Sequence, residues 1–286
     1  MTAMTHLKFL LLLLWVGVTE SAVLDLHKRI FKGYDCENTK HLYHVKITAA
    51  NRTHISRCGG SLIHREWVLT AAHCWIDQPG WTMSAYVGIH PGPGSMVTIR
   101  DHQIFQDQSR KHDIMLLKIS PASIRTDLVQ LPDCKIPPKI GNEIKIAGLG
   151  GYLVDLQNIA LPDEPPHLKC ARMHVVNCGL NRTPCNSPAL WPNGNTMCYE
   201  QAGVDTCPVS CHAANIYSPL SDVLKKTYGL YFLSQGDSGG GVMFNNMIYG
   251  VHVGSGKCVC SRSAVSLKVC SYIGWINHYI TPNNGK

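Results

Sequence analysis

Gln235-Gly236-Asp237-Ser238-Gly239-Gly240-Gly241 is the stretch on which the interpretation of the whole sequence depends. Glycine has no Cβ, so its backbone can take tight turns and approach a ligand closely. A serine hydroxyl at such a turn is exposed, and neighbouring N–H groups can converge on one point, as an oxyanion hole requires. The alternative is an ordinary surface turn. A serine is a poor nucleophile without a base, so a histidine and a carboxylate elsewhere would decide between the two.

Two segments supply candidates for these partners. His73 follows the small residues Ala71 and Ala72 and precedes Cys74. It is a candidate general base, or else a structural histidine beside a disulfide. Asp113 begins the apolar run 114–119. A carboxylate there is costly unless it has a partner, and an imidazole N–H would be one.

The sequence around these residues is typical of an all-β protein. Short β-rich runs are separated by Gly, Pro and Asn turns, which favours a barrel or a sandwich. These runs cover residues 43–47, 67–71, 84–89, 96–99, 114–119, 144–147 and 242–253. Apolar residues at three- and four-residue spacing from Tyr272 to Ile280 predict one helix at the end of the chain.

The order His73, Asp113, Ser238, each in a matching motif, resembles the chymotrypsin/trypsin family of serine endopeptidases. The resemblance covers residues 30 to about 280. It implies two packed six-stranded antiparallel β-barrels with a C-terminal helix, a boundary near residues 140–145 and an active site in the cleft between the barrels. By this resemblance Ser238 is the nucleophile, His73 the general base and Asp113 the residue that orients the histidine. The N–H groups of Gly236 and Ser238 would bind the oxyanion.

The N-terminal region indicates export and activation by cleavage. Residues 1–22 resemble a signal peptide, because the apolar run 9–18 is roughly half of the ~20 residues that a membrane span needs. Residues 23–29 form a predicted propeptide, and residues 30–286 the protease domain. The resemblance implies that cleavage after Arg29 frees the Ile30 amine to pair with Asp237, as in a zymogen. We therefore predict a secreted, extracellular protein, with glycosylation sequons at Asn51 and Asn181.

The cysteines provide a separate comparison with the family. Thirteen cysteines in an exported chain indicate disulfides. The resemblance implies the pairs Cys36–Cys170, Cys58–Cys74, Cys134–Cys270, Cys178–Cys198 and Cys207–Cys258. It leaves Cys185, Cys211 and Cys260 without an assigned partner, and because three is an odd number at least one thiol is free or pairs between chains.

Two registers compete for the floor of the specificity pocket. Counting back from Ser238 places Phe232 there, whereas the other register places Asp205 there and treats residues 208–234 as an insertion. We prefer the second register, because Cys207 can then pair with Cys258. A desolvated Asp205 carboxylate would favour Arg or Lys in the substrate. The opposite wall, Val253-Gly254-Ser255, departs from the family's usual Ser-Trp-Gly.

These departures leave two functions open. The first is a secreted serine endopeptidase that prefers Arg or Lys at the cleaved bond. The alternative is a catalytically impaired binding or decoy protein, or an inactive isoform, because of the insertion at residues 208–234. The expected partners are protein or peptide substrates and protein protease inhibitors.

The sequence predicts neither a cofactor nor a metal site. The loop 90–95 lacks the acids that Ca²⁺ needs, and Cys207, Cys211 and His212 fit disulfide chemistry better than zinc binding in an exported chain. The net charge of +7 is spread thinly along the 286 residues and indicates no nucleic-acid site. We also predict no membrane span.

Overall fold

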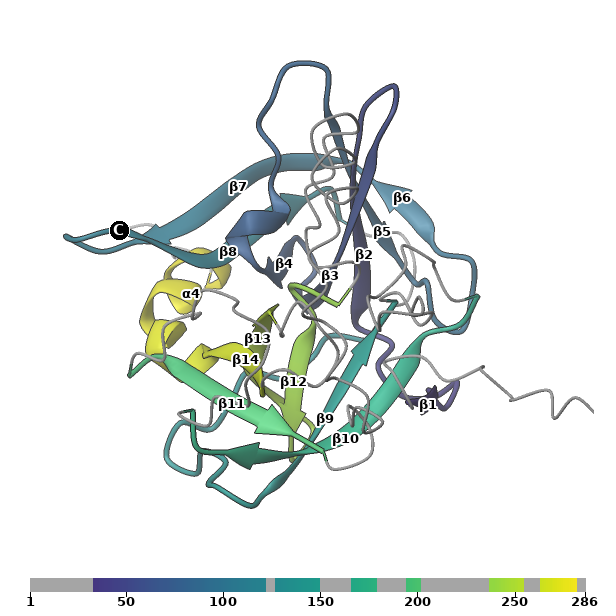
Figure 1. Ribbon diagram of the computed structural model, residues 1–286. Coiled ribbons are helices and arrows are strands. Elements are labelled where there is room, and N and C mark those ends of the chain that lie inside the picture. Colours follow the sequence, from purple (N-terminus) through teal and green to yellow (C-terminus); the bar gives the residue numbers. More distant parts are fainter. Residues whose placement is uncertain are drawn as a thin grey trace, which may run out of the picture.

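A computed structural model describes residues 33–121, 127–149, 166–178, 194–201, 237–254 and 263–281. These ranges contain two antiparallel sheets and one C-terminal helix (Figure 1). The predicted signal peptide and propeptide, the 208–234 insertion and the Asn181 sequon lie outside them.

The first sheet comprises strands in the order β6-β5-β2-β3-β4-β8-β7, which form the upper part of Figure 1. Their bounds are β2 His44–Ala50, β3 Ile55–His64, β4 Trp67–Thr70, β5 Thr82–Val87, β6 Ser95–Val97, β7 Ile99–Gln106 and β8 Lys111–Ile119. β8 is the most apolar of them, because Ile114 to Leu117 are fully buried. This strand carries Asp113 near its start.

The second sheet closes into a barrel in the lower part of Figure 1. The ring runs β10-β11-β14-β13-β12-β9 and closes where β9 pairs with β10, while β1 adds to the edge of β10. Their bounds are β1 Tyr34–Asp35, β9 Glu143–Gly148, β10 Lys169–Val176, β11 Thr196–Glu200, β12 Gly241–Phe244, β13 Met247–Gly254 and β14 Ala264–Lys268. The predicted all-β, two-barrel fold is confirmed, with the second sheet closed and the first curled as a half-barrel.

The predicted run 242–253 is two strands rather than one. β12 and β13 form a hairpin whose turn residues, Asn245 and Asn246, have φ angles of 49° and 61°. Two consecutive positive φ angles are typical of the tight turn that best matches the twist of paired strands, and asparagine tolerates them. The hairpin brings Ser238, just before β12, alongside β13.

The C-terminal helix attaches to the first sheet. A 3₁₀ turn, η3 Val269–Tyr272, leads into α4 Ile273–Ile280. The Tyr279 ring lies 5.5 Å from that of Trp67, and its hydroxyl donates to Gln103 Oε1 at 3.2 Å. The predicted helix is thus confirmed, and its apolar face is buried against β4 and β7.

Four disulfides link distant segments, and they are the pairs that the resemblance implies: Cys36–Cys170, Cys58–Cys74, Cys134–Cys270 and Cys178–Cys198. Two of them join residues more than 130 positions apart, which restricts the unfolded chain strongly. Cys207, Cys258 and the three unassigned cysteines lie outside the described residues. Within the described ranges, the helices do not combine the length and apolar character of a membrane span.

Candidate active site

His73 and Asp113 are joined by two hydrogen bonds. His73 lies in the 3₁₀ turn η1 Ala72–Cys74, and Asp113 is on β8, which continues the sheet beside β4. The His73 Nδ1 atom lies 2.8 Å from Asp113 Oδ2, and the His73 backbone N–H donates to Asp113 Oδ1 at 2.8 Å. The carboxylate therefore holds both the ring and the backbone of His73, and it favours the tautomer with a proton on Nδ1.

The loop that carries Ser238 packs directly against the His73 segment. The Gly59 N–H donates to the Ser238 carbonyl oxygen at 2.7 Å, and the Cys74 sulfur lies 3.7 Å from the same oxygen. Cys58–Cys74 is a disulfide, so these contacts tie both of its ends to the serine loop. Ser238 thus lies beside the residue that follows His73.

Gly239 has to be a glycine for two independent reasons. Its φ angle is +82°, in the left-handed region that side chains disfavour. A Cβ at this position would also collide with Thr70 Oγ1 and the Gly59 carbonyl oxygen. The close contact between the two halves of the molecule therefore depends on the missing side chain.

The serine differs from the sequence prediction in one respect. Ser238 is fully buried rather than exposed, and its carbonyl oxygen accepts a hydrogen bond from the Gly59 N–H on β3. His73 Nε2, the atom that would take the serine proton, is also buried and has no hydrogen-bond partner among the described residues.

Asp237 lies against Gly148, which pairs with Lys169 where β9 and β10 close the barrel. A Cβ on Gly148, at the end of β9, would overlap with Asp237 Oδ1. The Asp237 N-terminal partner predicted from the sequence, Ile30, lies outside the described residues, as do Arg29, Gly236 and Asp205. The structure therefore brings together His73, Asp113, Asp237 and Ser238 and leaves the other predicted site residues undescribed.

A buried pair beside this loop, His252 on β13 and Tyr199 on β11, was not predicted from the sequence. The Tyr199 hydroxyl lies 2.6 Å from His252 Nδ1. Burial, followed by the neighbouring His73 imidazole, lowers the pKa of His252 from 6.5 to about 4. Burial, followed by the Asp237 carboxylate, raises the pKa of Tyr199 well above 10. The one signal for this pair in the sequence was a lone histidine in the apolar run 248–253.

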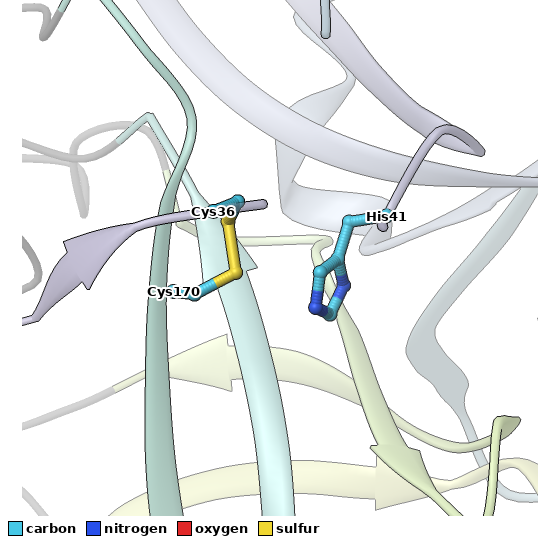
Figure 2. A group of neighbouring side chains, drawn as sticks. All are labelled: Cys36, His41 and Cys170. Carbon is cyan, nitrogen blue, oxygen red and sulfur yellow. A yellow bond between two sulfur atoms is a disulfide. The ribbon is translucent and has the colours of Figure 1, made fainter. Parts of the chain in front are cut away.

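Two groups of side chains have the composition of a metal site but not its chemistry. Figure 2 shows the His41 ring next to Cys36 and Cys170, whose sulfurs are bonded to each other. Cys58 and Cys74 are likewise a disulfide beside His73. A disulfide sulfur is not the thiolate that binds metal, so neither group fits a metal ion.

Comparisons with known proteins agree with the fold. The Trypsin family model matches residues 30–209, which include His73 and Asp113 but end before Ser238. Serine protease 1 of Canis lupus familiaris is 28% identical over 97% of this chain and 100% of its own length. The thrombin-like enzyme cerastocytin of Cerastes cerastes is 28% identical over 89% of this chain and 88% of its own length.

Among solved structures, mouse neuropsin, a serine protease expressed in the limbic system, has a TM-score of 0.61 at 23% identity, covering 86% of this chain and 98% of its own. The scabies mite inactivated protease paralogue S-I1 has a TM-score of 0.61 at 22% identity, covering 87% and 98%. The molecule is thus a serine endopeptidase of the two-barrel class. The chain belongs to the Trypsin family.

Proposed function

We propose that the protein is a secreted serine endopeptidase, made as a zymogen, that hydrolyses peptide bonds with Ser238, His73 and Asp113. The observation that carries the proposal is the double hydrogen bond from His73 to Asp113, with the Ser238 loop packed on the same segment. A histidine whose Nδ1 is held by a carboxylate has its Nε2 available as a base, and a base is what a serine nucleophile needs.

The reaction follows from these roles. His73 Nε2 takes the Ser238 hydroxyl proton as the serine oxygen bonds to the scissile carbonyl carbon. The imidazolium, stabilised by Asp113, then gives that proton to the leaving amine, and an acyl-enzyme remains. Water, deprotonated by the same Nε2, releases the acid and restores the serine. The N–H groups of Gly236 and Ser238 bind the oxyanion in both steps, at roughly 3 kcal/mol per donor.

Activation by cleavage after Arg29 would complete this site. The freed Ile30 amine would pair with Asp237, the residue directly before Ser238, and so order the loop from Gly236 to Ser238. The glycine at position 148 supports this role, because a side chain there would collide with the Asp237 carboxylate. Export is supported by residues 1–22 and by four disulfides, which form in oxidising compartments.

Two residues bear on substrate preference. Asp205, at the predicted pocket floor, would by itself favour Arg or Lys at the cleaved bond. That residue lies outside the described ranges, so the preference is supported by the sequence alone. His252, which the structure describes beside Ser238, bears on the same question.

A second function is favoured by one observation. The Trypsin family model stops matching at residue 209, where the predicted insertion begins and before Ser238 is reached. One protein of the same fold, the scabies mite paralogue, is named as an inactivated protease. A protease-fold binding or decoy protein is therefore the alternative.

Covalent labelling separates the two functions. The full chain is cleaved after Arg29, the new N-terminus is verified by sequencing, and the product is treated with a fluorophosphonate. We expect an adduct that the Ser238→Ala variant lacks and that a matched Ser56→Ala variant, in β3, retains. Absence of a Ser238-dependent adduct in the verified product would favour the binding protein.

A further inference from the structure

We propose that His252, held by Tyr199, is a specificity-determining residue that donates a hydrogen bond to the substrate side chain preceding the cleaved bond, and that this side chain is Gln or Glu. The inference rests on the proposed endopeptidase function and names its substrate class. The shared chemistry of the two side chains is a terminal oxygen that accepts a hydrogen bond.

The position of His252 is set by the loop that carries the nucleophile. Its carbonyl oxygen accepts from the Gly239 N–H at 2.7 Å, and its N–H donates to the Gly240 carbonyl oxygen at 2.9 Å. Gly239 and Gly240 directly follow Ser238. When the substrate carbonyl carbon bonds to the Ser238 oxygen, the substrate side chain next to that carbonyl must lie close to the backbone contact between His252 and the serine loop.

The hydrogen bond of the buried Tyr199 hydroxyl decides which ring nitrogen of His252 carries the proton. Tyr199 is fully buried, and His252 Nδ1 is the partner recorded for its hydroxyl. A buried hydroxyl proton that donates to nothing is costly, so Tyr199 donates and Nδ1 accepts. The remaining ring proton is then on Nε2. Because burial lowers the pKa of His252 to about 4, the ring is uncharged at neutral pH.

The Nε2 proton is the unused donor. Nε2 makes no hydrogen bond to the residues that the structure describes. His252 is itself a buried residue. Both ring nitrogens of His44 are enclosed atoms without a partner, whereas Nε2 of His252 is not among the enclosed atoms of this kind in the described part of the chain. The donor on Nε2 is therefore within reach of a bound molecule.

The surrounding barrel is shaped to hold the pair. Tyr199 is opposite Ala264 in the β11–β14 register, and His252 is opposite Ser266 in the β13–β14 register. These two small residues leave room for the two rings in the barrel interior. Ser266 Oγ donates to the Met197 carbonyl oxygen at 3.4 Å and does not compete for Nε2.

An uncharged N–H donor distinguishes substrate side chains that end in a hydrogen-bond acceptor from those that end only in donors. A Gln or Glu oxygen accepts the hydrogen bond, whereas Lys and Arg carry donors alone and would oppose donor to donor. A site built around a polar group rejects a side chain that leaves this group unpaired. The proposal thus predicts the opposite preference to the one that Asp205 would give.

The test uses the activated full chain and five peptides that differ only in the residue before the cleaved bond: Gln, Glu, Lys, Arg or Leu. We expect kcat/KM for Gln or Glu to exceed that for Lys and Arg by about tenfold or more. Gln above Glu would indicate an amide substrate, and the reverse a carboxylate. Equal or higher rates for Lys and Arg would overturn the proposal.

Two variants assign the preference to the pair. Tyr199→Phe removes the hydroxyl alone, and His252→Leu removes the donor. Both should reduce the advantage of Gln and Glu over Leu at least about fivefold, whereas the matched control Tyr279→Phe, on α4, should not. An unchanged advantage in Tyr199→Phe and His252→Leu would contradict the proposal.

Two further readouts leave both Tyr199 and His252 unchanged. In Ser238→Ala protein, ring-nitrogen NMR should show the proton of His252 on Nε2, and a proton on Nδ1 would refute the argument. Fluorophosphonate labelling of the activated wild type separates the two levels of failure. An adduct with cleavage after Lys or Arg refutes the specificity alone, whereas no adduct refutes the endopeptidase and the specificity together.

Discussion

Asp113 holds His73 at two atoms, which gives the carboxylate a positioning role besides its charge. The ring bond selects the tautomer, and the backbone bond fixes the 3₁₀ turn on which the histidine lies. An amide in place of the carboxylate keeps the shape but can place an N–H against Nδ1, which favours the wrong tautomer.

We therefore expect Asp113→Asn to lower kcat/KM by about 10³–10⁴-fold with a small change in KM. Steady-state kinetics on the best of the five peptides measures both constants. Asp101→Asn, at an exposed aspartate on β7 that bonds its own strand, is the matched control and should change kcat/KM less than twofold or so. A loss of less than about tenfold in Asp113→Asn would contradict the proposed role of Asp113 in orienting His73.

At the scale of elements, the serine loop joins the two sheets by close backbone contact. Gly239, just before β12, lies so close to the Gly59 carbonyl oxygen on β3 that it has no room for a side chain, and a Cβ on Gly59 would be in tight contact with Gly240. His44, fully buried on β2, packs against the same two segments, with its ring 3.1 Å from the place of a Gly59 Cβ.

Substituting Gly239 separates this packing from backbone strain. Gly239→Ala would meet both a positive φ and collisions, whereas Gly80→Ala would meet a φ of +85° with nothing within 4 Å. Backbone strain alone costs about 1–2 kcal/mol. We expect urea unfolding to show that loss in Gly80→Ala and a loss of at least about 3 kcal/mol in Gly239→Ala, with labelling of Ser238 abolished. Equal losses in the two variants would mean that the loop can move aside.

Several strands could not have been predicted from their own residues. β3 contains Gly59 and Gly60, which are poor strand formers, and β10 and β11 mix apolar with charged and cysteine residues. Their strand geometry comes from pairing with neighbours on both sides. The helix, by contrast, was predictable because its periodicity lies within one segment.

At the scale of the whole molecule, buried histidines make stability depend on pH. Burial is the largest cause that lowers the pKa of His44 to about 3 and those of His41 and His252 to about 4, against 6.5 for an ordinary histidine. These rings are neutral in the folded state, and below pH 6.5 the unfolded chain binds more protons. The free energy of unfolding therefore falls as the pH drops from 6.5 toward 4.

Each of these rings should lower the free energy of unfolding by about 2 kcal/mol at pH 5 relative to pH 7, since one unit of pKa shift corresponds to about 1.4 kcal/mol. Urea unfolding at pH 7.5, 6 and 5 measures the loss. His44→Leu removes one ring that has no hydrogen-bond partner among the described residues and should reduce the pH dependence by about a third. A free energy of unfolding that stays constant over this range would contradict the assignment of these rings as neutral.

The amino-acid sequence by itself determined the class of the protein. The order of His73, Asp113 and Ser238, the cysteine positions and the terminal helix are local motifs, so they can be recognised without coordinates. Only the tertiary structure decided that Ser238 is buried, that Gly239 has no room for a side chain and that Tyr199 meets His252. These features depend on contacts between residues on different strands, 53 positions apart for that pair, and the local sequence carries no information about such distances.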